Sequence, residues 1–174
     1  MRRLTAAALV FAGAFAAAGF TALASDARIE TRVDARIRAM VGALADSLQR
    51  EGVPAEPMID YALEGTQKRG APEVILGGVH KWAADLRRAR RALGPNATPA
   101  EITAGAKALR AGADEQSLTR LRDRKGDVRY ASALNTVAYI IPLGVPADTA
   151  TTILVNLALA SATDAQLAEL QAAV

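Results

Sequence analysis

The signals that decide the fold lie together in residues 70–101, GAPEVILGGVHKWAADLRRARRALGPNATPAE. Apolar residues recur there at steps of three and four, which predicts an amphipathic helix over residues 72–93. Gly70 suits the end of a preceding helix because glycine accepts a left-handed backbone. Pro72 suits the first turn of the next helix, where its missing N–H costs nothing. Thr98-Pro99-Ala100-Glu101 has the pattern of a capping box, so another helix is expected from residue 99.

The same punctuation recurs along the rest of the chain. It is found at Gly52-Val53-Pro54, Gly112-Ala113-Asp114, Gly144-Val145-Pro146 and Ala162-Thr163-Asp164. The predicted helices cover residues 26–50, 54–64, 72–93, 99–110, 114–123, 128–141, 147–159 and 164–173. The fold class is therefore all-α, with about seven to eight helices. Starts at 54, 99 and 146 have the spacing of helical repeats, which leaves open an irregular multi-helix bundle or a short solenoid-like array of helical hairpins.

Composition excludes several classes of site and protein. The chain has 174 residues, of which 22% are charged, too many for a polytopic membrane protein. It has no cysteine, which excludes disulfides, cysteine-ligated metal sites and thiol catalysis. A single histidine, His80, excludes a site built on two histidines of one chain. No metal and no cofactor is expected from these residues.

Residues 1–24 have the features of a secretory signal peptide. Arg2 and Arg3 precede the uncharged apolar stretch Leu4–Phe20, and Ala22-Leu23-Ala24 matches a small-x-small cleavage site. We expect cleavage after Ala24, a single domain over residues 25–174, and a periplasmic or secreted location. The alternative is an uncleaved membrane anchor, since about 20 apolar residues can span a bilayer. Removal of the leader lowers the formal net charge from +3 to +1, because both of its charges are arginines.

Basic residues gather on the polar side of the predicted helix over residues 72–93. The candidate binding residues on this face are Lys81, Arg87, Arg88 and Arg91, with Arg90 beside them. A second cluster, Arg120, Arg122, Arg124 and Lys125, closes a later helix. These cations could form a solvated face or bind an envelope protein or another anionic surface partner. No nucleic acid is expected as a partner, because no aromatic residues are interleaved with the arginines to stack on bases.

Candidates for catalysis are few. His80 projects onto the polar side of its predicted helix, and no nucleophile or orienting acid can be assigned to it. Asp60 and Glu64 lie four residues apart, so both could face one cleft and hydrolyse a glycan if one carboxyl were desolvated. Solvated helix charges explain the same spacing, and no residue is assigned a catalytic role.

Residues 128–162 are the most apolar stretch after the leader. Proline and glycine at residues 142–146 divide it into two helices, each too short to cross a bilayer, and we expect a buried helical hairpin at the centre of the domain. A small-ligand pocket beside it would involve Trp82, Asn135 and Tyr139. Gly77-Gly78, inside the predicted helix over 72–93, marks a kink or a close helix crossing.

Several of these segments resemble a group of bacterial proteins. The segments are residues 63–65, 68–72, 91–95, 104–105 and 109–112, LEG, KRGAP, RALGP, AG and LRAG. They resemble uncharacterised exported Ala/Leu/Arg-rich helical proteins of bacteria, in which Gly-Val-Pro turns separate short helices. The resemblance implies export and an all-α fold, and it brings no activity with it.

These observations favour binding over catalysis. The expected function is that of an exported interaction or scaffold domain of the bacterial cell envelope, binding a partner through packed helices. The alternatives are a small-ligand carrier that uses the 128–162 hairpin and a small envelope hydrolase that uses Asp60 and Glu64.

Overall fold

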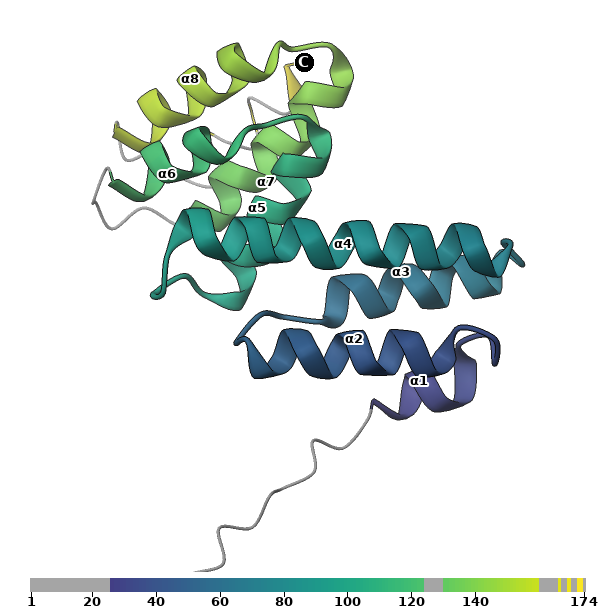
Figure 1. Ribbon diagram of the computed structural model, residues 1–174. Coiled ribbons are helices and arrows are strands. Elements are labelled where there is room, and N and C mark those ends of the chain that lie inside the picture. The colour runs from purple at the N-terminus through teal and green to yellow at the C-terminus, as the bar shows by residue number, and fades with distance from the viewer. Residues whose placement is uncertain (1–25, 124–129, 160–165, 167–168, 170–171, 174) are drawn as a thin grey trace, which may run out of the picture.

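The regular elements of the chain are all helices in the part that the structure describes, which confirms the predicted all-α class (Figure 1). The computed structural model describes residues 26–123, 130–159, 166, 169 and 172–173. The predicted leader and most of the predicted helix over 164–173 lie outside these residues. The elements are α1 (Ala27–Arg32), α2 (Arg38–Arg50), α3 (Glu56–Gln67), α4 (Pro72–Leu93), α5 (Pro99–Ala111), α6 (Glu115–Asp123), α7 (Tyr130–Ile140), the 3-10 helix η1 (Ile141–Leu143) and α8 (Ala147–Leu159).

The predicted capping box sets the start of α5. The backbone N–H of Glu101 donates to the Thr98 hydroxyl at 3.3 Å, and the backbone N–H of Thr98 donates to the Glu101 carboxylate at 2.7 Å. Pro99 occupies the first turn, and Gly112 ends the helix with a φ of 118°. Two otherwise unsatisfied N–H groups are thereby paired, so the sequence signals at both ends of this helix act as expected.

The predicted single helix over residues 26–50 is wrong, because the chain breaks into α1 and α2. Asp34 accepts the backbone N–H of Arg36 at 2.9 Å on its side chain, which replaces helical hydrogen bonding with a local turn. The backbone N–H of Asp34 donates to the Thr66 hydroxyl of α3 at 3.3 Å. Asp34 forms its ion pair with Arg36 at 2.9 Å, and the Arg38 guanidinium donates to the Val33 carbonyl at 3.1 Å.

The turn between α3 and α4 differs by one residue from the prediction. Arg69, and not Gly70, adopts the left-handed backbone, with a φ of 55°. The N–H of Gly70 donates to the Gly65 carbonyl and the N–H of Arg69 to the Thr66 carbonyl, both at 2.9 Å. This is the Schellman pattern that normally places glycine where Arg69 stands.

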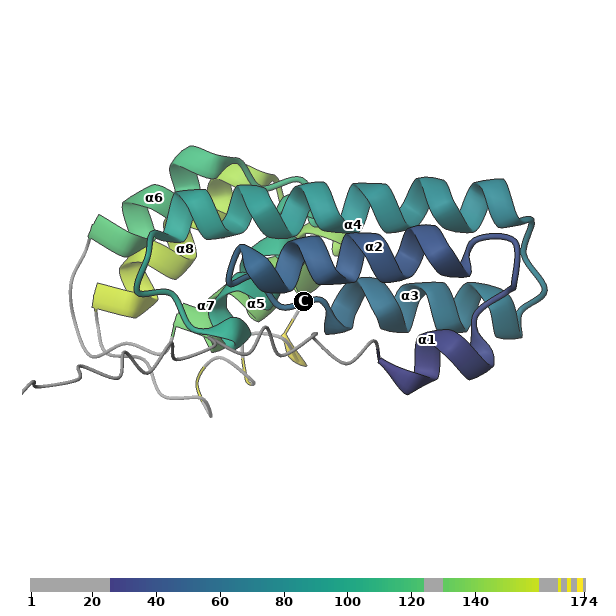
Figure 2. The same cartoon turned by 60° about the horizontal axis from the view of Figure 1, so that its bottom comes forward.

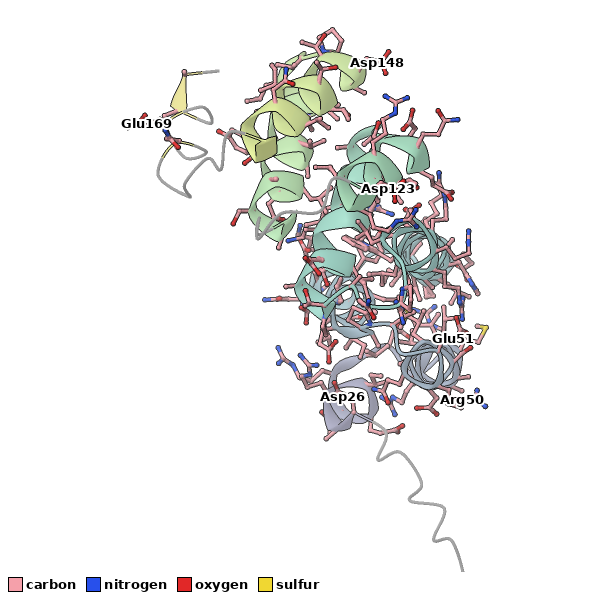
Figure 3. The ribbon with its side chains drawn as sticks, turned by 90° about the vertical axis from the view of Figure 1, so that its left-hand side faces the viewer. Asp26, Arg50, Glu51, Asp123, Asp148 and Glu169 are labelled. Carbon is pink, nitrogen blue, oxygen red and sulfur yellow. The ribbon has the colours of Figure 1, made fainter. Side chains whose placement is uncertain are left out.

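The helices pack mainly against helices that are near them in the chain. Close packing joins helices one or two places apart in the chain, as in α3 with α4, α4 with α6 and α5 with α7. Figures 1 and 2 show α4 running alongside α2 and α3 at one end and meeting the later helices at the other. In Figure 3 the chain progresses from Asp26 and Arg50 near one end of the molecule to Asp148 at the other. The bundle therefore has the sequential contacts of a helical array.

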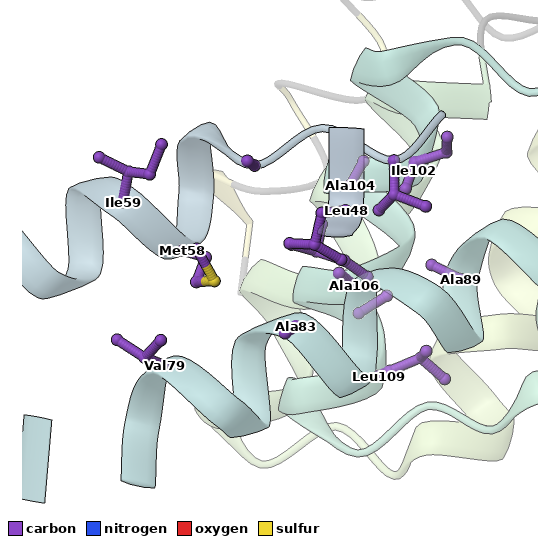
Figure 4. Close-up of a cluster of buried hydrophobic side chains, with 14 of the residues drawn as sticks. Leu48, Met58, Ile59, Val79, Ala83, Ala89, Ile102, Ala104, Ala106 and Leu109 are labelled. Atoms are coloured by element: carbon purple, nitrogen blue, oxygen red, sulfur yellow. The ribbon is translucent and has the colours of Figure 1, made fainter. Parts of the chain in front are cut away.

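Small and branched aliphatic side chains fill the core of this chain, in which only 4% of the residues are aromatic. Met58 of α3 and Val79 of α4 point into the space between these helices (Figure 4). The paired glycines of α4 play different parts in this crossing. A Cβ at Gly78 would overlap the Tyr61 ring of α3, whereas a Cβ at Gly77 would meet no atom within 4 Å. Gly78 therefore marks a close helix crossing, one of the two alternatives predicted for this pair.

The predicted central hairpin lies instead at the C-terminal end of the array. The helix α7 packs against α5, and α8 packs against α7 and α6. Asn135, Thr152 and Asn156 are exposed, so they do not need the buried partners that a central position would require. The buried Thr136 hydroxyl donates to the Ser132 carbonyl one turn earlier at 3.1 Å. Of the helices described, none has the length and apolar character to cross a membrane.

Candidate functional site

The candidate site is the solvent side of α4, which is the longest of the described helices and the richest of them in cations. It carries five basic residues, Lys81, Arg87, Arg88, Arg90 and Arg91, against the two acidic residues Glu73 and Asp85. Its apolar stripe at Ile75, Val79 and Leu86 is buried against the neighbouring helices, which turns the charged positions outward.

Arg87 joins α4 to α2. Its guanidinium donates to both carboxylate oxygens of Glu51 at 2.7 Å and to the Ser47 hydroxyl at 3.0 Å. The hydrogen bonds from Arg87 lower the pKa of the Glu51 carboxyl to about 2, and the same bonds raise the pKa of Arg87. A bidentate pair between two helices fixes the arginine in place, so Arg87 has a structural role.

Arg88 belongs to a network that joins α4, α5 and α6. It donates to Glu115 of α6 at 2.7 Å and to Asp85 at 3.2 Å, and the bond with Glu115 raises its pKa. Asp85 also accepts from Arg110 of α5 at 3.3 Å. The Arg110 guanidinium lies over the Trp82 ring, 4.6 Å from its centroid, where a cation–π attraction adds to the pairing.

Lys81 and Arg91 differ from these two arginines. Both are exposed, and no ion pair with another described residue involves them. Around them the exposed positions of α4 are mostly small or apolar. The exposed residues of the helix are Glu73, Val74, Gly77, His80, Lys81, Ala84 and Arg91.

Val74 is the residue of this surface that the sequence analysis did not single out. Its side chain is 69% exposed, the largest exposed fraction among the exposed large hydrophobic residues of the described chain. The exposure of Val74 could be predicted from the sequence, because this residue falls outside the apolar stripe that Ile75 and Val79 define. We use the name α4 face for the exposed residues that follow Glu73 on this helix, which are Val74, Gly77, His80, Lys81, Ala84 and Arg91.

The structure does not assemble a catalytic site from the predicted candidates. The side chains of Asp60 and Glu64 are 65% and 60% exposed. Asp60 lies 3.4 Å from Arg28, and Glu64 lies 2.5 Å from Lys68. Acid catalysis needs a desolvated carboxyl, and neither residue has that setting. His80 is exposed on the α4 face, with no described hydrogen-bond partner to orient its ring.

The three residues of the predicted pocket lie on separate parts of the array. Trp82 belongs to α4 and is covered by Arg110, whereas Asn135 and Tyr139 are exposed on α7. The helix α5 packs closely against both α4 and α7. The geometry therefore gives no support to a ligand pocket formed by these three side chains.

The described part of the second basic cluster has a mainly structural setting. Arg122 donates to Asp123 at 2.8 Å and to the Ala92 carbonyl at the end of α4 at 3.2 Å. Arg120 is exposed, and Arg124 and Lys125 lie outside the described residues. No group of three or more metal-ligating side chains gathers within the described ranges.

Comparison with known proteins adds no assignment. No protein-family model, curated protein or solved structure matches this chain.

Proposed function

We propose that the chain is an exported helical interaction domain of the bacterial cell envelope and that the α4 face binds an anionic partner. The observation that carries this proposal is that some cations of α4 form ion pairs with neighbouring helices and others do not. Arg87 is held by Glu51 at the end of α2 and Arg88 by Glu115 of α6. Lys81 and Arg91 are exposed without such a counter-charge among the described residues.

Two features support a binding role over a purely solvated face. Three acids around α4, Glu51, Asp85 and Glu115, are already bonded to arginines. The exposed cations therefore keep their attraction for an external anion. The ion pairs to Glu51 and Glu115 also fix α4 between two neighbouring helices, which presents the face on a rigid element. Export is proposed from the leader pattern of residues 1–24.

The binding experiment uses Lys81→Glu/Arg91→Glu, because these positions carry no interhelical bond. We expect the variant to elute from an immobilised polyglutamate column at lower salt than the wild type and to lose its partner in pull-downs from envelope extracts. The matched control is Lys107→Glu/Arg69→Glu, which makes the same charge change at exposed cations outside α4.

Charge reversal at Arg87 or Arg88 is unsuitable, because it would also break the bonds that join α4 to α2 and α6. Equal elution of wild type, variant and control, with unchanged partner recovery, would refute the proposed binding face. Export is tested separately by sequencing the N-terminus of the protein recovered from the cell envelope, which should begin at Ser25.

A further inference from the structure

We infer that the anionic partner of the α4 face is the surface of a membrane containing anionic phospholipid. This inference rests on the proposed function and specifies the partner's chemistry. Three observations carry it: the pairing of the nearby acids, the spacing of the free cations, and the apolar residues exposed between them.

The first observation is that acids near the α4 face are neutralised within the protein. Glu51 is bonded by Arg87, Glu115 by Arg88, and Asp85 by both Arg88 and Arg110. A negatively charged surface approaching α4 therefore meets Lys81 and Arg91 without strong repulsion from these carboxylates. The one acid among the exposed residues of α4 is Glu73, in its first turn.

The second observation is the distance between the free cations. Arg91 follows Lys81 by ten positions, so their backbone positions are about 15 Å apart along the helix. A single phosphate or carboxylate would contact both cations only if the two side chains extended toward each other. An array of headgroups contacts each cation where it stands, because it presents many negative charges over a plane.

The third observation is what lies between and beside these cations. Val74 is 69% exposed, and Gly77 and Ala84 are exposed on the same helix. Val74, Lys81 and Arg88 are spaced seven residues apart, which places them along one side of the helix. At a membrane interface, contact by exposed apolar side chains adds to the electrostatic attraction between cations and anionic lipids. A polar protein surface would gain little from an exposed valine and alanine.

The test is co-sedimentation of the purified full protein with phospholipid vesicles. We expect binding to vesicles of equal parts phosphatidylglycerol and phosphatidylcholine, and none to pure phosphatidylcholine. Lys81→Gln/Arg91→Gln should weaken this binding by about 30-fold, since each cation near an anionic bilayer contributes about fivefold. Val74→Asp should weaken it further, because a carboxylate would replace the apolar contact.

Lys107→Gln/Arg69→Gln is the matched control and should retain wild-type binding, and far-UV circular dichroism checks that every variant is folded. Absence of binding to the anionic vesicles overturns the inference, as does equal binding by the Lys81/Arg91 variant. Loss of polyglutamate retention in Lys81→Glu/Arg91→Glu without any vesicle binding would overturn the lipid assignment and leave the proposed function standing. If neither polyglutamate nor vesicles distinguish the variants from wild type, both proposals fail.

Discussion

The two neighbouring glycines of α4 should respond in opposite directions to the same substitution. Gly77→Ala adds a methyl group where no atom lies within 4 Å, whereas Gly78→Ala places it inside the space of the Tyr61 ring. Alanine stabilises a helix interior by about 1 kcal/mol relative to glycine, and both variants receive this gain. Overpacking of a helix crossing costs about 1–3 kcal/mol, and the ring overlap points to the upper end. Gly77→Ala should therefore be more stable than wild type by about 1 kcal/mol, and Gly78→Ala less stable by about 2 kcal/mol.

Urea unfolding followed by far-UV circular dichroism measures both free energies, and a double-mutant cycle identifies the cause. In the Tyr61→Ala background the overlapping ring is absent, so Gly78→Ala should become stabilising, as Gly77→Ala is in the wild type. Equal stability of Gly77→Ala and Gly78→Ala would refute the close crossing. So would a destabilisation by Gly78→Ala that persists unchanged without the Tyr61 ring.

Three further predictions follow from single contacts. Arg69→Gly should be more stable than Arg69→Ala by about 1 kcal/mol in urea unfolding, because only glycine adopts a φ of 55° without strain; equal stabilities would contradict this. Glu51→Gln should cost no more than about 1 kcal/mol near neutral pH, since the pair with Arg87 is partly solvent-exposed. The pKa of Glu51 is lowered from 4.5 to about 2, so its stabilisation is complete above the ordinary value and is lost as the pH falls toward 2. The wild type and Glu51→Gln should therefore converge in stability with increasing acidity, and a constant difference would count against the pair. Arg110→Ala should increase quenching of the single tryptophan, Trp82, by acrylamide, because it removes the guanidinium that covers the ring; unchanged quenching would show that this contact does not shield it.

Local signals predicted the helix ends that depend on local chemistry. The bounds of α4 agree with the prediction from the apolar stripe and Pro72, and the start of α5 agrees with the capping box at Thr98. In these places the deciding interactions join residues within one or two helical turns, so a short stretch of sequence contains them.

The break between α1 and α2 was missed because the apolar pattern continues across it. Ile29, Val33 and Ile37 are all buried, although the helix ends at Arg32. Asp34 is held by Thr66, which is 32 residues away along the chain. The spacing of apolar residues within one segment contains no information about a partner on α3.

Only part of the candidate site could be predicted from the sequence, because here too the deciding partners are distant along the chain. The cations of α4 could be placed on one side of a helix from their spacing alone. Their spacing does not show which of these cations are free of ion pairs, because the partners of Arg87 and Arg88 lie 36 and 27 residues away along the chain. The structure therefore divides one predicted basic face into interhelical arginines and exposed cations.

The position of α4 has a mechanical consequence for any ligand of its solvent side. The helix packs against α2 and α3 along one part and against α5 and α6 along another, and it supplies the principal packing between the early and late helices. It thus connects the two ends of the array. A small bend in α4 would change the angle between these two ends, whereas a ligand lying along the helix would limit its bending. Occupancy of one surface could in this way be transmitted to helices that the ligand never touches.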